Sequence, residues 1–189
     1  IANFEINFLI NNAGIGGTLS ISESSFEALD KIIQLNIRSM TCITRRLLPH
    51  LIKHEKSYIM NVSSMAAFTP IAYKTVYPAS KAFVSSFSLG LREELQGSGL
   101  SVSLIYPGPI MTNSNVSSRI IKQGFIARMG LLPTSAIARI SLNKTLKGKA
   151  VIIPGIWNSI SYYLMKILPL ETKLKIVSRE VKKEVAFSI

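Results

Sequence analysis

A tyrosine and a lysine four positions apart are the residues of this 189-residue chain best placed to do chemistry. In Tyr77-Pro78-Ala79-Ser80-Lys81 this spacing would set both side chains on one face of a helix, one turn apart. An ammonium group near a phenol favours the phenolate, so we expect the pKa of Tyr77 below its reference value of about 10. A tyrosine tuned in this way can pass a proton near neutral pH. Taken alone, the same spacing also suits an ordinary solvated helix face.

A serine thirteen residues before the tyrosine would add a second hydroxyl to this site. The apolar segment 57–62 is typical of a buried strand, and Ser64 follows its carboxyl end. Open α/β sheets bind their ligands at that end of their strands. The small residues Ala79, Ser80 and Ala82 beside the tyrosine also weaken the solvated-face interpretation.

The serine and the Tyr-x-x-x-Lys stretch resemble the pattern of the classical short-chain dehydrogenases/reductases. Three further signatures of that family follow in order: Asn11-Asn12-Ala13-Gly14 after an apolar strand, Asn36 in the next helix, and Pro107-Gly108 after a third strand. The resemblance covers roughly residues 5–155. It implies an α/β fold, a Rossmann-like doubly wound parallel sheet, with residues 1–155 forming the carboxyl-terminal part of one such domain. Residues 156–189 depart from the commonest ending of the family, and their pattern predicts a basic amphipathic helical tail.

The resemblance also implies roles for four residues in interconverting a carbonyl and a secondary alcohol. In the reduction direction Tyr77 would donate a proton to the carbonyl oxygen, and Ser64 would hydrogen-bond that oxygen. Lys81 would lower the pKa of Tyr77 and hold the nicotinamide ribose, and Asn36 would position a proton-relay water. An asparagine within an apolar helix stripe could instead cap a kink in a long helix.

The cofactor implied by the family is NAD or NADP, which would carry the hydride chemistry. The residues implied to contact it are Asn12, Ala13, Gly14, Tyr77, Lys81, Pro107, Gly108, Ile110 and Thr112. We expect no metal site, because the two histidines at 50 and 54 have no third ligand nearby and suit a solvated helix end. The irregular stretch 113–133 matches the variable substrate loop of the family. Its residues Met129, Leu131 and Leu132 could line an apolar pocket or pack over the sheet edge.

The glycine-rich turn that cradles the cofactor pyrophosphate in this family is absent from the sequence. The units that carry it would take on the order of 80 residues, at about 30 per βαβ unit. The stretch Gly14-Ile15-Gly16-Gly17 lacks the GxGxxG spacing and follows the wrong strand. We therefore expect a truncated chain that alone binds NAD(P) poorly, is inactive, and exposes a strand edge and one sheet face. The rival hypothesis is a non-catalytic remnant or a membrane-associated interaction module.

Composition limits the remaining classes of function. Apolar residues make up 48% of the chain, which is typical of a globular protein, and the one cysteine, Cys42, suits a reducing compartment such as the cytoplasm. Within its helical pattern we expect Cys42 to be a buried, inert thiol. The net charge of +12 could indicate nucleic acid, an anionic membrane surface or an acidic substrate, but no aromatic-interleaved basic patch favours nucleic acid.

Periodicity predicts the elements that position these residues. We expect strands over 7–10, 57–62, 100–106 and 149–153. We expect helices over 26–52, capped by Ser22 or Ser24, over 76–96, and from a cap at Thr134 or Ser135 to about residue 146. The apolar side of the helix over 76–96 is too broad for the sheet alone. In the family this helix and the preceding long one pair with a second subunit, which implies a homodimer.

The tail after residue 155 contains two apolar stripes, interrupted by Pro169. From Lys144 onward the chain has nine basic and three acidic residues. Basic amphipathic helices can lie in an anionic membrane interface, and neither segment is long enough to span a bilayer. The sequence therefore leaves open a peripheral membrane contact, or packing of the tail on the core or on a partner subunit.

Overall fold

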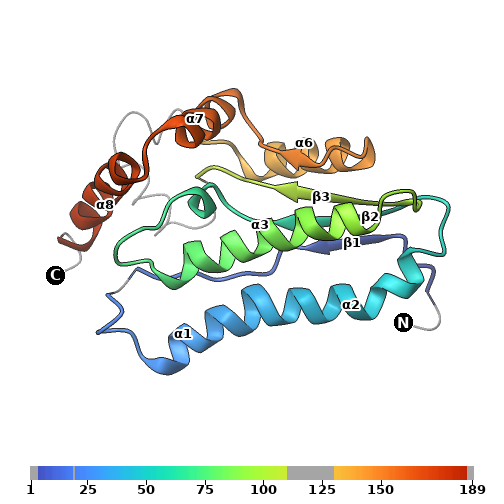
Figure 1. The fold of residues 1–189 in the computed structure, drawn as a ribbon, viewed down its shortest axis with the longest axis horizontal. Coiled ribbons are helices and arrows are strands. Elements are labelled where there is room, and N and C mark those ends of the chain that lie inside the picture. The colour runs from blue at the N-terminus through green and yellow to red at the C-terminus, as the bar shows by residue number, and fades with distance from the viewer. Residues whose placement is uncertain (1–3, 19, 110–129, 187–189) are drawn as a thin grey trace.

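A parallel four-stranded sheet forms the centre of the computed structural model, which describes residues 4–18, 20–109 and 130–186 (Figure 1). The strands are β1 (Phe8–Asn11), β2 (Ser57–Val62), β3 (Leu100–Ile105) and β4 (Val151–Ile152), and they are ordered β1-β2-β3-β4. The register pairs Leu9 with Ile59 and Ile59 with Val102. Parallel neighbours need crossover connections, and helices supply them. This arrangement confirms the predicted Rossmann-like α/β class.

Helices cover both faces of the sheet (Figure 1). They are α1 (Phe26–Ile33), the π-helix η1 (Gln34–Ser39), α2 (Met40–Leu51), the 3-10 helix η2 (Met65–Phe68), α3 (Val76–Glu94), α6 (Thr134–Leu146), α7 (Ile156–Ile167) and α8 (Leu170–Ala186). Helices α2 and α3 pack on one face, whereas α6 packs on the other face of β2, β3 and β4.

The core divides into two layers because successive residues of a strand point to opposite faces. The layer under α2 and α3 contains Leu9, Leu47, Leu51, Ile59, Leu91, Leu100 and Val102. The layer under α6 contains Met60, Ile105 and Ile152, with Leu142 packed against them. Strand β3 is buried along nearly its whole length, as expected for a central parallel strand with helices on both sides.

Strand β1 lies at the edge of the sheet, and within the described ranges it pairs with β2 alone. Its Ile10 is 47% exposed, whereas the paired Met60 on β2 is 6% exposed. Helix α6 packs on β2, β3 and β4, so the described helices leave the face of the sheet uncovered at β1. The described part of the chain thus has the unpaired strand edge that the sequence predicts.

The long helix predicted over 26–52 begins at Phe26 and stays helical to Leu51, but residues 34–39 form a π-helix. Its cap is Ser25, whose side chain accepts a hydrogen bond from Ala28 N, so the predicted cap at Ser22 or Ser24 is wrong. The Ser24 hydroxyl instead donates to the Ser20 carbonyl at 2.8 Å.

Two further local expectations are wrong. Pro133 precedes α6 with no side-chain cap, so neither Thr134 nor Ser135 caps it. Cys42 is exposed, because it lies on the outer side of α2, away from the buried residues Thr44 and Leu47.

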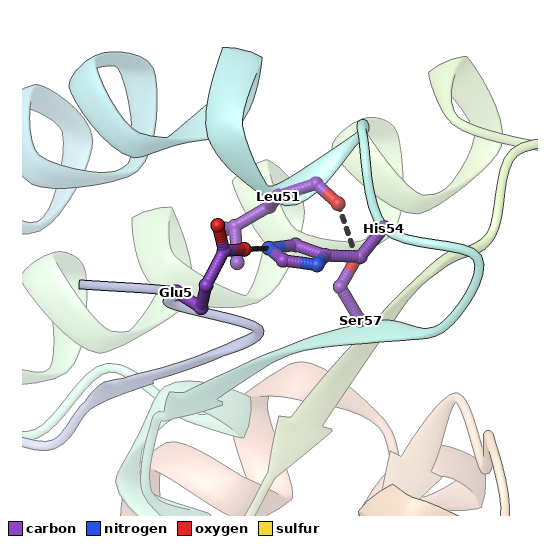
Figure 2. A network of polar contacts seen from close by, with 4 residues as sticks. All are labelled: Glu5, Leu51, His54 and Ser57. Carbon is purple, nitrogen blue, oxygen red and sulfur yellow. Dashed lines mark hydrogen bonds and ion pairs between the residues drawn. The ribbon is translucent and has the colours of Figure 1, made fainter. Parts of the chain in front are cut away.

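Polar contacts link the start of β2 and the turn before it to neighbouring segments (Figure 2). The hydroxyl of Ser57 donates to the carbonyl of Leu51 at 2.6 Å, which joins the end of α2 to the start of β2. His54 Nε2 lies 3.7 Å from Glu5 Oε2. The residues that the structure describes contain no group of three potential metal ligands, at His54 or elsewhere.

Helix α7 has one buried face and one exposed face. Asn158 and Tyr162 are buried, and the Tyr162 ring lies 4.8 Å from the Phe68 ring and 5.9 Å from the Tyr106 ring. The exposed face carries large apolar side chains: Ile156, Trp157, Ile160, Tyr163, Leu164 and Ile167. None of the helices in the described segments is both long and apolar enough to cross a membrane.

Candidate active site

The structure brings the predicted serine and tyrosine together. Ser64 follows β2 in extended conformation and caps η2, where its hydroxyl accepts a hydrogen bond from Ala66 N at 3.1 Å. Tyr77 lies in the first turn of α3, and the side chain of Ser64 is close enough to its phenol to lower the pKa of Tyr77 in part. A carbonyl oxygen placed at these two hydroxyls could contact both of them.

The predicted lowering of the Tyr77 pKa is wrong for this structure. Burial raises the pKa of Tyr77 above 10, and the hydrogen bond to Ser64 lowers it only in part. Lys81 lies on the same side of α3, but its Nζ is 6.0 Å from the centre of the Tyr77 ring. That amine donates to the carbonyl of Val62 instead, at 3.0 Å. Tyr77 is therefore protonated at neutral pH, which is the form that can donate a proton.

Lys81 is nearly inaccessible to solvent, at 5% exposed. Burial lowers its pKa to about 8, because an ammonium group loses hydration inside the protein. The carbonyl of Lys81 accepts a 2.8 Å hydrogen bond from the hydroxyl of Ser63, which fixes α3 against the end of β2. The site thus holds an amine that can change charge near physiological pH.

Asn36 connects three segments around this amine. It is 2% exposed and lies in the π-helix. Its Oδ1 accepts from Ile15 N at 2.9 Å, and its Nδ2 donates to Ile15 O and to Ser80 Oγ, each at 2.9 Å. These side-chain bonds reach the segment after β1 and helix α3, so they do not cap a kink in the helix of Asn36 itself.

The segment after β1 runs close to the other predicted site residues. Asn12, Ala13 and Gly14 are exposed. A Cβ atom on Gly14 would lie 3.1 Å from Asn36 Oδ1 and 3.1 Å from Lys81 Nζ. An exposed glycine therefore lies after the carboxyl end of β1, next to the buried amine.

A second glycine of this segment packs on the tyrosine. A Cβ atom on Gly16 would lie 2.9 Å from Cδ2 of the Tyr77 ring. The neighbouring Gly17 has no atom within 4 Å of such a position. The ring of Tyr77 thus has a close backbone neighbour at Gly16.

The turn after β3 contains two of the predicted cofactor contacts, Pro107 and Gly108. Pro107 is buried, and its carbonyl accepts a hydrogen bond from Met65 N at 3.2 Å, so this turn contacts η2 directly. Gly108 follows it. Ile110 and Thr112 lie outside the described residues, as does most of the predicted substrate loop.

Sequence reasoning missed a buried polar network between the strands and helices. Asn11 Nδ2 donates to Asn61 Oδ1 at 2.7 Å and to Thr44 Oγ1 at 3.0 Å, and Asn61 Nδ2 donates to Ser88 Oγ at 2.9 Å. Asn11 and Asn61 are opposite each other in the register of β1 and β2. Two asparagines, each at or near the carboxyl end of an apolar strand, were the signal that could have found this network.

A small cavity of about 60 Å³ adjoins the site. It is lined mostly by apolar side chains together with the tyrosine, among them Ile21, Leu29, Ile32, Val76 and Tyr77. An apolar group could be accommodated next to the Tyr77 ring.

Comparisons with known proteins agree with this geometry. A family model described as short chain dehydrogenase matches residues 3–122. The chain is 41% identical over 105 residues to a serine 3-dehydrogenase of Agrobacterium fabrum (strain C58 / ATCC 33970), covering 55% of this chain and 42% of that protein. It is 36% identical over 125 residues to a very-long-chain 3-oxoacyl-CoA reductase of Anas platyrhynchos, covering 63% of this chain and 39% of that protein.

A solved structure is similar as well. The closed form of serine dehydrogenase complexed with NADP+ is 25% identical, with a TM-score of 0.55, and the match covers 88% of this chain and 61% of that one. The chain spans about two fifths of the length of the curated relatives that it matches. The family model covers well over half of the chain, and the chain belongs to the short-chain dehydrogenase family.

Proposed function

We propose that this protein is an NAD(P)-dependent oxidoreductase that interconverts a carbonyl and a secondary alcohol. The observation that carries the proposal is that the Ser64 side chain acts directly on the phenol of Tyr77, one helical turn from the buried amine of Lys81. All three residues lie at the carboxyl end of β2, where parallel sheets bind ligands.

In the reduction direction Tyr77 donates its phenolic proton to the carbonyl oxygen, and Ser64 donates a hydrogen bond to the same oxygen. The raised pKa of Tyr77 keeps it in the donor form until the oxygen gains charge. Lys81 then returns a proton to the phenolate and regains one from solvent through a water that Asn36 positions. Gly14 lies against both Asn36 Oδ1 and Lys81 Nζ, which supports such a relay.

The described residues fit a nicotinamide cofactor at the reacting end. Asn12, Ala13 and Gly14 are exposed, and Gly14 has no side chain to block the close approach of a flat group. Lys81 Nζ is within reach of a ribose, and Gly108 ends the turn after β3. Such a cofactor supplies or accepts the hydride when bound. Similar solved structures are described as complexes with NADP+, NAD or NADH, and Ile110 and Thr112 remain proposed contacts.

The substrate that we propose has an apolar, lipid-like portion. The cavity beside Tyr77 has a mostly apolar lining, and one relative is a very-long-chain 3-oxoacyl-CoA reductase. The serine 3-dehydrogenase relative makes a polar hydroxy acid the natural alternative. A panel containing medium-chain 3-oxoacyl thioesters and serine separates the two classes by their kcat/KM values.

We also propose that the chain by itself does not complete the cofactor site. It spans about two fifths of its curated relatives, and its sequence has no GxGxxG stretch. A fluorescence titration of the 189-residue chain with NADPH should show no saturable binding below millimolar concentration. Tight binding would contradict this part of the proposal.

The test of the reaction uses the chain joined to the amino-terminal cofactor-binding part of the Agrobacterium fabrum relative. Tyr77→Phe should reduce kcat by about 10²–10⁴-fold, the range for loss of a general acid, while the Kd for NADPH stays unchanged. Tyr163→Phe, at a tyrosine that is 63% exposed on α7, is a matched control outside the proposed site. Activity retained in Tyr77→Phe would remove the tyrosine from the acid role.

A homodimer is part of the same proposal. Apolar side chains on the outer sides of α2 and α3 are exposed: Ile43 at 46%, Phe83 at 38% and Leu89 at 40%. Light scattering after size exclusion should give twice the monomer mass, and Phe83→Glu should shift it to the monomer. A monomer in the unsubstituted protein would contradict the dimer.

The alternative function, a membrane-associated module in the cytoplasm, is favoured by one observation. Large apolar side chains cover the outer face of α7, including Ile160 at 51% exposed and Ile167 at 82% exposed, in a chain of net charge +12. Flotation with phosphatidylserine vesicles should then carry the protein upward, and Ile160→Glu should abolish this. Equal behaviour of both proteins would remove the membrane contact.

A further inference from the structure

A buried asparagine on α7 lies at the meeting point of three chain segments. Asn158 is 5% exposed and lies in the first turn of the helix. Its Nδ2 donates to the carbonyl of Pro154 at 2.8 Å and to the carbonyl of Gly130 at 3.0 Å. One amide group thus joins the start of α7 to a residue 28 positions earlier in the sequence.

Three glycines surround the same carboxamide. A Cβ atom on Gly108 or on Gly130 would overlap it, and a Cβ atom on Gly155 would lie 3.1 Å from Nδ2. Gly155 also has a φ of +93°, a conformation that favours glycine. The absence of side chains at these positions lets the backbone close around Asn158 from three sides.

The inner face of α7 also supports the other half of the site. Tyr162, one turn beyond Asn158, packs on Phe68 of η2, the short helix that Ser64 caps. The carbonyl of Pro107 in turn accepts a hydrogen bond from Met65 of η2. Asn158 therefore packs against the Pro107–Gly108 turn, and Tyr162 packs against η2, which follows Ser64.

We propose that Asn158 is a positioning residue that holds the Pro107–Gly108 turn in the place needed for the nicotinamide cofactor. This inference rests on the proposed function, because that turn is a proposed cofactor contact. The carboxamide fills the space beside Gly108 while its two N–H groups hold Pro154 and Gly130. An aspartate at 158 would keep the shape but would face two carbonyl oxygens without a donor, so it should fail in the same role.

The first test uses the 189-residue chain and hydrogen exchange followed by mass spectrometry. Asn158→Ala and Asn158→Asp should each raise exchange at least fivefold in peptides covering residues 106–109 and 130–132. Peptides covering β1 should be unchanged. Asn143→Ala, at an exposed asparagine on α6, is the matched control and should change neither region. Unchanged exchange at 106–109 in both variants would overturn the proposal.

A pair of substitutions guards against general unfolding. Gly108→Ala should lower the Tm, because the added methyl group overlaps the Asn158 carboxamide. The double variant Gly108→Ala with Asn158→Ala should lose less Tm than the two single variants lose together, since removing the carboxamide makes room for the new methyl group. Additive effects would overturn the direct contact between these residues.

The second test uses the chain joined to the amino-terminal part of its Agrobacterium relative. Asn158→Ala should raise the KM for NADPH about tenfold and leave the KM for the carbonyl substrate unchanged. An unchanged KM for NADPH would overturn the positioning role and leave the oxidoreductase proposal standing. No turnover in the unsubstituted protein would overturn the oxidoreductase proposal, while the exchange measurements still decide whether Asn158 holds the turn.

Discussion

The Nζ of Lys81 donates a 3.0 Å hydrogen bond to the carbonyl of Val62, the last residue of β2. This bond crosses from helix α3 to the sheet at the point where Ser64 begins η2. It fixes the amine in the interior, where burial lowers its pKa to about 8. The bond to Val62 therefore helps to hold the amine where burial lowers its pKa.

The lysine should make the stability of the protein depend on pH. The pKa falls from 10.5 unfolded to about 8 folded, so the unfolded chain binds more protons between these values. The free energy of unfolding should therefore rise from pH 8 to pH 10, by on the order of 2 kcal/mol relative to Lys81→Met. Urea unfolding at four pH values measures this, with exposed Lys147→Met as the control. Parallel curves for Lys81→Met and the control would contradict it.

The serine hydroxyl should control the titration of the tyrosine. The hydrogen bond from Ser64 lowers the Tyr77 pKa against the larger effect of burial. Ser64→Ala should therefore move the Tyr77 midpoint to higher pH. The phenolate absorbance at 295 nm, taken as the difference between each protein and its Tyr77→Phe partner, gives that midpoint. A midpoint that falls or stays constant would show that the bond does not act on the phenol.

Gly16 and Gly17 should respond differently to the same substitution. In Gly16→Ala the new Cβ atom would lie 2.9 Å from the Tyr77 ring, whereas Gly17→Ala meets nothing within 4 Å. Gly16→Ala should cost roughly 1–3 kcal/mol of stability by overpacking, and Gly17→Ala less than about 0.5 kcal/mol. Urea denaturation measures both. Equal costs would show that the segment moves away from the ring freely.

The buried asparagine network should contribute strongly to stability. Asn61 is fully buried, and its side chain bonds to both Asn11 and Ser88. Asn61→Ala should lower the free energy of unfolding by roughly 2–4 kcal/mol, since it leaves buried polar groups unpaired and opens a cavity. Asn7→Ala, at an exposed side chain, should change it by less than about 0.5 kcal/mol. A cost below 1 kcal/mol for Asn61→Ala would mean that other groups take over its bonds.

The sequence predicted the elements best where the apolar pattern had clear limits. The strand over 57–62 is observed with those bounds, and the helix predicted to end near residue 146 ends at Leu146. The proximity of Ser64 and Tyr77 also followed from pattern, because Ser64 comes shortly after a strand and Tyr77 lies in the first turn of a long helix.

Quantities that depend on the surroundings of a side chain could not be predicted from spacing. The Tyr77 pKa rises because burial outweighs its neighbours, and the spacing to Lys81 contains no information about burial. Cys42 lies outside because the buried stripe of α2 passes through Thr44 and Leu47 instead. The contacts of Asn158 with Gly108 and Gly130 join segments whose approach no local pattern encodes.

The π-helix at residues 34–39 determines how the whole helix from Phe26 to Leu51 is phased. Buried residues recur at Ile32, Asn36 and Met40, a spacing of four. In a regular α-helix each such step would carry the side chain about 40° further around the axis. The π-helix has more residues per turn, which offsets this rotation and keeps Asn36 on the same buried side as Ile32 and Met40. Removing one residue from this turn would rotate α2 as a block, so the length of the turn matters as much as the residues in it.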